Sequence, residues 1–272
     1  MSRALRRAAA VALTLAALAL PAAGCGAKKK QAAASASARE TYDRGTELLS
    51  RRKLRQAIDS LQRIEFSEDI DQELIPLARL GVADATFYRL SDLSLIEGRS
   101  LYLDFVTLYG SHPLAPYAQL QAGKCSLDQV RHPSRDQTQT HQAIDDLGRV
   151  IALWPDTVYA FAAESMMRQA RANLVEAEFR IGKFYLERDA YQAAAERFRG
   201  ALDLDPNYED LDKVYFFLGK TLINSDNPTE ARVYLDKLVH DFPDGRWTDD
   251  AKKALASVGG TLDRGVDDEA VR

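Results

Sequence analysis

Residues Val175 to Pro206 read VEAEFRIGKFYLERDAYQAAAERFRGALDLDP, and this stretch decides the fold. At helical spacing, apolar and small side chains share one face in each half, namely Ile181, Gly182 and Tyr185 in the first and Ala194, Phe198 and Ala201 in the second. Pro206 cannot continue the second helix. Small residues at Gly182 and Ala194 let two backbones approach closely. The stretch therefore predicts an antiparallel helical hairpin in which Gly182 and Ala194 face each other.

One such hairpin cannot bury its own apolar face, so the chain needs further copies, and the pattern resembles a tetratricopeptide repeat (TPR). Similar patterns cover Glu40–Phe66, Leu77–Pro113, Tyr117–Pro155 and Tyr215–Pro243. The Leu77–Pro113 copy is irregular, and the register of its small residues is ambiguous. The sequence predicts an all-α fold, a TPR solenoid of about five helical hairpins.

The spacing of helix breakers predicts how the hairpins are joined. From Thr157 no glycine occurs until Gly182 and no proline until Pro206, which predicts one long helix to about Glu187. A short helix over Thr248–Val258 is expected to cap the array with a polar outer face. The repeat domain is thus predicted to span residues 40–258, and residues 259–272 are predicted to form a disordered acidic tail.

The amino terminus has the pattern of an export signal. Arginines at positions 3, 6 and 7 precede an apolar run over Ala8–Leu20, which predicts a signal peptide at residues 1–24. Ala23-Gly24-Cys25 resembles a bacterial lipobox, although Ala22 stands where leucine is usual. That resemblance implies acyl chains such as palmitate on Cys25, followed by a flexible tether over residues 25–39. An ordinary secretory cleavage site with a chance cysteine is the alternative.

The charge and the cysteines narrow the class of protein. The chain carries 36 basic and 40 acidic residues, so it lacks the basic footprint of a nucleic-acid-binding protein. Membrane attachment is expected to come from lipid. Apart from Cys25 the chain has only Cys125, which leaves no intramolecular disulfide after lipidation. Cys125 is predicted to be a small buried helix residue, with a reactive thiol as the alternative.

No motif for catalysis or metal binding is found. The histidines lie apart from one another and from cysteine, so no spacing predicts a metal site; they are His112, His132, His141 and His240. The sequence has no nucleophile elbow, phosphate loop or dinucleotide fingerprint. We therefore expect a protein that is not an enzyme and that has no cofactor beyond the lipid on Cys25.

An ordered series of residues resembles the BamD family, the lipoproteins of the outer-membrane β-barrel assembly (BAM) machinery. The series comprises Arg135-Asp-Gln-Thr-Gln-Thr, Ala143-Ile, Trp154-Pro155-Asp, Tyr159-Ala, Leu174, Glu178, Phe184-Tyr185, Tyr191, Ala194 and Arg197. The similarity covers roughly Thr41 to Trp247.

The resemblance implies an adaptor at the periplasmic face of the outer membrane. Its implied partners are the periplasmic domains of a BamA-like barrel protein, other BAM lipoproteins, and segments of nascent outer-membrane proteins. In the family, the amino-terminal repeats are linked to substrate segments and the carboxy-terminal repeats to BamA. The resemblance also implies partner-binding roles for Arg135, Asp136, Glu178 and Arg197.

Alternatives remain at two levels. Arg197 could instead form an exposed ion pair, for instance with Glu196 or Asp203, without contacting a partner. The whole chain could be a repeat lipoprotein that serves a pilus, a secretin or cell-wall coordination. A lipid-anchored cell-wall hydrolase is the competitor from a different functional class.

Overall fold

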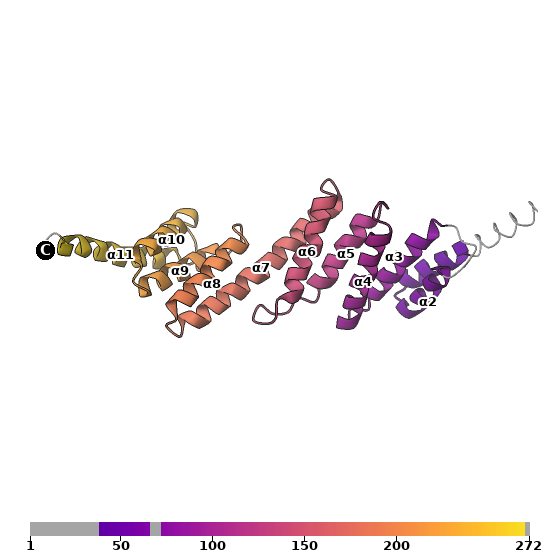
Figure 1. Ribbon diagram of the computed structural model, residues 1–272, viewed down its shortest axis with the longest axis horizontal. Coiled ribbons are helices and arrows are strands. Elements are labelled where there is room, and N and C mark those ends of the chain that lie inside the picture. The colour runs from indigo at the N-terminus through magenta and orange to yellow at the C-terminus, as the bar shows by residue number, and fades with distance from the viewer. Residues whose placement is uncertain (1–37, 66–71, 270–272) are drawn as a thin grey trace, which may run out of the picture. The chain divides into compact units, whose positions relative to one another are not determined.

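The computed structural model describes residues 38–65 and 72–269, except for the side chains of Glu65 and residues 260–269 (Figure 1). The predicted signal peptide, Cys25 and the tether up to residue 37 lie outside the described residues. Within them, every regular element is a helix, which confirms the all-α prediction. None of the described helices is long and apolar enough to cross a membrane.

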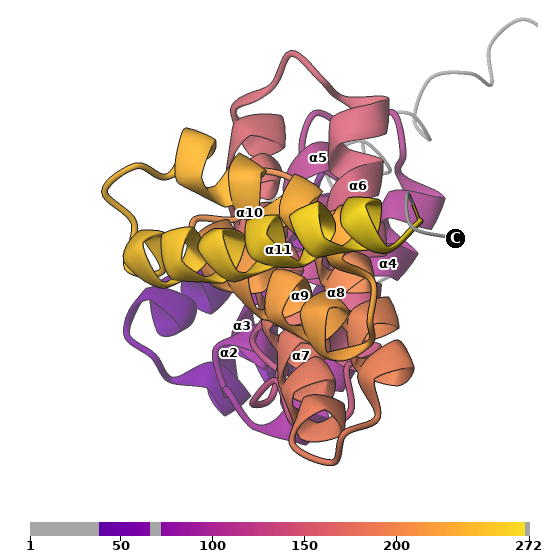
Figure 2. The ribbon, with the colours of Figure 1, turned by 90° about the vertical axis from the view of Figure 1, so that its left-hand side faces the viewer.

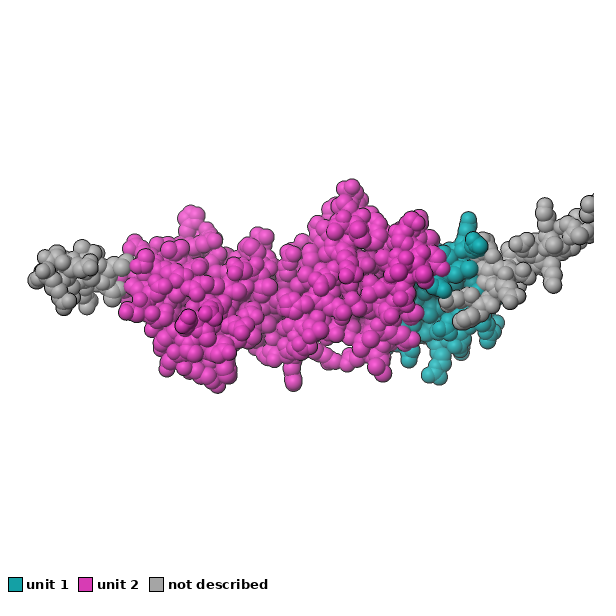
Figure 3. Space-filling model, viewed as in Figure 1, with its two compact units in different colours: residues 1–90 teal, residues 91–272 magenta. Residues whose placement is uncertain are grey.

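The chain divides into two compact units between Leu90 and Ser91 (Figure 3). The first unit contains a helix over 38–50, α2 (Leu54–Glu65) and α3 (Leu74–Phe87). The first helix therefore includes residues 38 and 39, which the sequence assigned to the tether. Leu61 of α2 lies at the centre of this unit, because a Cβ atom added at Gly45 or Gly81 would come within 2.6 or 2.8 Å of its side chain.

The second unit is itself an array of antiparallel helices. It comprises α4 (Asp92–Leu108), α5 (Ala115–Leu127), α6 (Thr138–Leu153), α7 (Val158–Leu186), α8 (Tyr191–Leu204), α9 (Leu211–Asn224), α10 (Pro228–Asp241) and α11 (Thr248–Glu269). Each helix packs against the next one along the chain. The irregular copy predicted at Leu77–Pro113 is divided between the units: α3 packs on α2, and α4 packs on α5. Its register was ambiguous because Gly81 of α3 faces Leu61 of α2.

The long helix predicted from Thr157 to Glu187 is confirmed as α7, which has 29 residues. The hydroxyl of Thr157 caps it by accepting the backbone N–H of Ala160 at 3.3 Å. Its first half packs on α6 through Ala163 and its second half on α8 through Val175 (Figure 1). A single helix is thus shared by two successive hairpins.

A glycine on the first helix of a hairpin faces a large side chain on the second. The pairs are Gly45–Leu61, Gly123–Leu147, Gly182–Phe198 and Gly219–Leu235. A Cβ atom at Gly182 would lie 2.6 Å from Cε1 of Phe198, far inside van der Waals contact. Gly182 does lie at the hairpin contact, but the prediction that Ala194 faces it is wrong, because the side chain opposite is Phe198. Ala194 is buried on the same face of α8, but the ring of Phe198, one turn further along, fills the space above the glycine.

The carboxyl end of the array is closed by aromatic packing and by α11. The ring of Phe217 lies 5.3 Å from that of Phe179 and 5.2 Å from that of Trp247, measured between centroids. α11 begins at the predicted Thr248 and packs against α10 and α9 (Figure 2). It runs on to Glu269, past the predicted end at Val258, because no proline follows to stop it. Of the predicted acidic tail, residues 270–272 lie outside the described residues.

Cys125 lies fully buried in α5, as the sequence predicted. Burial raises the pKa of its thiol to about 12, so the thiol stays protonated and unreactive at neutral pH. In the Cys25→Ser chain, we expect iodoacetamide at pH 8 to leave Cys125 unmodified in the native protein and to modify it fully in denaturant. Mass spectrometry measures both, and rapid labelling of the folded chain would contradict this assignment.

Candidate partner-binding surface

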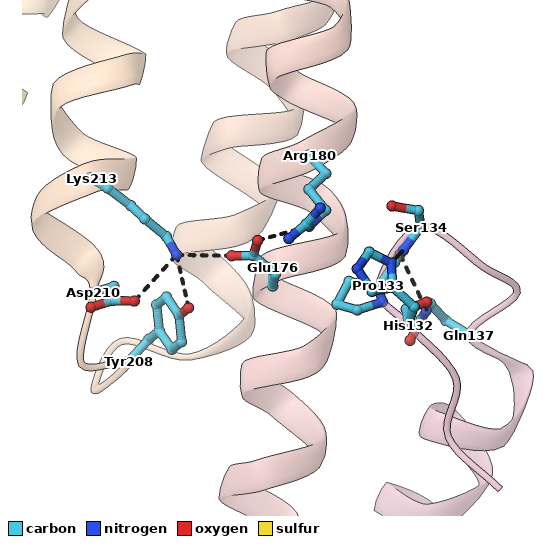
Figure 4. A network of polar contacts seen from close by, with 9 residues as sticks. All are labelled: His132, Pro133, Ser134, Gln137, Glu176, Arg180, Tyr208, Asp210 and Lys213. Atoms are coloured by element: carbon cyan, nitrogen blue, oxygen red, sulfur yellow. Dashed lines mark hydrogen bonds and ion pairs between the residues drawn. The ribbon is translucent and has the colours of Figure 1, made fainter.

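The side chain of Gln137 makes several hydrogen bonds that hold the loop between α5 and α6. Its amide nitrogen donates to the backbone carbonyls of His132 and Pro133 at 3.4 and 3.3 Å (Figure 4). It also donates to the carbonyl of Arg135 at 2.9 Å. Its amide oxygen accepts a hydrogen bond from Nδ2 of Asn173 on α7, at 2.6 Å. Gln137 therefore both shapes the loop and fastens it to α7.

The loop, α7 and α8 enclose a hollow of about 190 Å³. It is lined by apolar residues, Pro133, Leu174, Ala177, Ile181 and Leu204, and by polar ones, Ser134, Arg135, Gln137, His141 and Glu178. A shallower depression continues from it over Glu196, Arg197 and Gly200, and shares Glu178 and Leu204 with it. We call these two depressions together the α7–α8 hollow. It offers apolar area beside charges of both signs, a combination suited to a protein segment.

Three of the four residues predicted to bind a partner lie around this hollow. Arg135 lines one side, and Glu178 is common to both depressions. Arg197 reaches from α8 to Glu178 on α7, with Nη1 3.2 Å from Oε2. The ion-pair partner of Arg197 is thus Glu178, and neither Glu196 nor Asp203. The two side chains are 45% and 27% exposed, so the pair contributes at most about 1 kcal/mol to stability.

Asp136, the fourth residue, is not among the residues that line the hollow. Its carboxylate accepts hydrogen bonds from the hydroxyl and the backbone N–H of Thr138, at 3.0 and 3.4 Å. The second of these bonds satisfies one backbone N–H at the start of α6, where the helix dipole also favours a carboxylate. A contact of Asp136 with a partner stays a prediction, as does lipidation of Cys25.

A second polar network was not predicted by the sequence. Glu176 on α7 accepts hydrogen bonds from Arg180 and from Nζ of Lys213 on α9, both at 2.8 Å. Lys213 also donates to the hydroxyl of Tyr208 at 3.1 Å and to Asp210 at 3.3 Å (Figure 4). Burial alone would lower the pKa of Lys213, but hydrogen bonds to Glu176 and Tyr208 raise it above its usual range. The charged lysine therefore ties α7 to α9 directly.

Neither network has a signature in the sequence. Each network joins residues from different helices or loops, and no periodic pattern in the sequence links the bonded residues. The bonded pairs are Gln137 with Asn173 and Glu176 with Lys213. The nearest signal is Gln137 itself, which falls inside the Arg135-Asp-Gln-Thr-Gln-Thr run. In the part of the chain that the structure describes, no group of histidine, cysteine or carboxylate side chains could hold a metal ion.

Stacked antiparallel helix pairs, four of them in the described residues closed by a glycine against a large side chain, define a helical-repeat protein of the TPR type. The family model YfiO, described as an outer membrane lipoprotein, matches residues 34–223. The chain belongs to this family, and its predicted resemblance to the BamD family is confirmed.

Two relatives carry the name outer membrane protein assembly factor BamD. The protein from Caulobacter vibrioides is 25% identical over 218 residues, which cover 80% of this chain and 70% of that one. The protein from Rickettsia prowazekii is 24% identical over 207 residues, covering 76% and 80%.

Similar solved structures are TPR proteins. The TPR2AB domain of yeast Sti1 in a pHSP90 complex has a TM-score of 0.43 at 14% identity and covers 84% of both chains. The TPR protein YrrB has a TM-score of 0.31 at 16% identity and covers 78% of this chain and 90% of its own.

Proposed function

We propose that this chain is a lipid-anchored adaptor of the β-barrel assembly complex, held at the periplasmic face of the outer membrane. The observation that carries the proposal is the family match over residues 34–223, which includes every element around the α7–α8 hollow. The names of the two relatives support the same role. The adaptor helps to fold and insert outer-membrane proteins by binding other proteins, without chemistry of its own.

The α7–α8 hollow is the proposed docking site for the periplasmic domains of a BamA-like barrel protein. Apolar side chains such as Leu174 and Ile181 supply area to bury, while Arg135 and Arg197 supply charges that fix orientation. Gln137 and Lys213 hold the surrounding elements in place before a partner arrives. A preformed site of this kind loses little conformational entropy on binding. Other BAM lipoproteins and nascent outer-membrane segments are proposed as further partners.

Affinity purification of the detergent-extracted protein tests the proposal. We expect mass spectrometry of the captured proteins to identify a barrel protein with periplasmic domains. Capture of a secretin or pilus component instead would favour the alternative repeat lipoprotein. Hydrolysis of purified peptidoglycan by the chain would reject a purely adaptor role.

Cys25 is proposed as the anchor, because the thiol that follows the predicted cleavage point is the one that becomes acylated in lipoproteins. Intact-mass analysis of the membrane-extracted chain should show acyl additions on a mature form that begins at Cys25. Cys25→Ser should release the chain from membranes, since several acyl chains are needed for stable anchoring. An unmodified Cys25 in the extracted protein would rule this assignment out.

A further inference from the structure

The turn of the first hairpin is strongly basic in a chain whose net charge is −4. It connects the helix over 38–50 to α2. Its exposed cationic side chains, which we call the basic turn, are Arg51, Arg52, Lys53 and Arg55. No similar group of cations occupies the corresponding turns of the hairpins that end in α8 and α10.

The repeat geometry does not require an arginine in this turn. Arg52 has a φ of 58°, and the residues in the same place in the later hairpins, Asp189 and Asp226, have φ values of 57° and 58°. Aspartate tolerates this left-handed conformation because its short side chain can bond to the local backbone, which a long arginine side chain does not do. The three turns thus share one backbone, and only the first carries a cation at this position.

The positive charges of Lys53 and Arg55 are also unfavourable for the helix that follows. Both lie at the amino-terminal end of α2, where the helix dipole disfavours positive charge. The first turn of α10, by contrast, contains Glu230, which the dipole favours. Residues that break a local rule without stabilising the fold indicate a functional demand.

Little of this charge is neutralised within the first unit. Arg51 pairs with Glu47 at 2.7 Å, but both side chains are mostly exposed. The guanidinium of Arg52 lies 4.0 Å from the centroid of the Tyr88 ring, a contact that retains its charge. Among the described residues, neither Lys53 nor Arg55 forms an ion pair. The basic turn therefore presents net positive charge to its surroundings.

We propose that the basic turn binds the phosphate headgroups of an anionic lipid bilayer and holds the first hairpin against the membrane. This inference rests on the proposed lipid anchor at Cys25. Residues 25–37 can span at most about 45 Å, and the basic turn lies about 20 Å along the helix from residue 38. The anchor thus keeps the turn within reach of the headgroups, so individually weak contacts suffice. Tyr88, with an apolar ring and a polar tip, suits the same interface.

Vesicle co-sedimentation at low salt tests this inference with the unlipidated Cys25→Ser chain, purified from residue 25 onward. The probes are vesicles of phosphatidylethanolamine with phosphatidylglycerol and vesicles of phosphatidylcholine alone. We expect binding only to the anionic vesicles. Combined Arg51→Gln, Lys53→Gln and Arg55→Gln substitutions should weaken it by on the order of a hundredfold, since each cation near a charged surface contributes severalfold.

The matched control removes three exposed cations from the second unit, by Arg168→Gln, Arg171→Gln and Lys220→Gln. It has the same net charge as the test variant and should bind the anionic vesicles like the parent. Equal weakening by both variants would overturn the proposal, because net charge alone would then explain binding. Competition by millimolar inorganic phosphate would also overturn it in favour of a small-anion site. The assay contains no protein partner and no acyl chain. Its outcome therefore does not depend on whether the proposed adaptor function or the proposed lipid anchor is correct.

If the test variant binds vesicles like the parent but captures less of the BamA-like partner, the basic turn serves a protein contact and the lipid assignment is wrong. Circular dichroism of each variant should match the parent, since the substituted side chains are exposed. If the triple variant loses helical signal, the double variant Lys53→Gln with Arg55→Gln is measured in its place. These two side chains form no ion pair among the described residues, and the pair should still weaken binding at least tenfold.

Discussion

Replacement of Gly182 by leucine should lower the stability of the repeat domain by about 1 to 3 kcal/mol, or more, because the new side chain meets the ring of Phe198. Even a Cβ atom would lie 2.6 Å from that ring. Phe198 has little room to move, since it is fully buried between Phe179 and Phe217. Thermal unfolding followed by circular dichroism should show a melting temperature lower by on the order of 5 °C.

Two further variants make this measurement specific to the contact. Gly148→Ala on α6 is the control, because nothing lies within 4 Å of a Cβ atom there. It should stabilise the chain by about 0.5 to 1 kcal/mol through helix propensity. Gly182→Leu combined with Phe198→Ala should unfold at a higher temperature than Gly182→Leu alone, since the ring that the leucine meets is gone. A parental melting point for Gly182→Leu would show that the hairpin register is wrong.

Replacement of Arg197 by glutamate should leave folding nearly intact and sharply reduce capture of the BamA-like partner. The pair with Glu178 is partly exposed, so its loss costs at most about 1 kcal/mol of stability. Removing one partner of a charge pair buried in a complex costs about 2 to 5 kcal/mol of binding free energy, which corresponds to a thirtyfold or greater loss of affinity. Capture by immobilised protein, quantified beside melting curves, measures both effects.

A charge swap separates the two roles of Arg197. Arg197→Glu combined with Glu178→Arg re-forms the ion pair between α7 and α8 with reversed polarity. If Arg197 contacts the partner, the swapped variant should remain defective in capture. Recovery of capture would assign Arg197 to the intramolecular pair alone. Arg232→Glu on α10, which breaks an exposed pair with Asp236, is the control for a general charge effect and should capture normally.

The parts of the fold that the sequence predicted well are those with a periodic signal. The absence of breakers between Thr157 and Gly182 predicted the long α7. The predicted apolar face of α8 is buried at Ala194, Phe198 and Ala201, whereas Ile181 on α7 is 37% exposed and lines the hollow. The spacing of small residues located the hairpin contact on the correct faces. It could not tell whether Ala194 or Phe198 fills the space at Gly182, because that depends on the rotamer and on the offset between two helices.

The candidate site was predictable only through the family resemblance. Arg135, Glu178 and Arg197 have no motif of their own, yet the fold brings them to one hollow. The bonds of Gln137 to Asn173 and of Glu176 to Lys213 were missed, since they join polar groups far apart in the chain. Such contacts arise from the need of partly buried polar groups for partners, which leaves no regular spacing in a sequence.

Because two hairpins share α7, insertions and deletions in this helix should be poorly tolerated. A single residue inserted in the middle of a helix turns everything beyond it by about 100° and moves it by about 1.5 Å. In the middle of α7 such an insertion would carry Glu178 and Arg197 together with α8 away from the α5–α6 loop, whose Arg135 lines the same hollow. Length variation among related genes should therefore avoid α7 and collect in connections such as the one between α5 and α6.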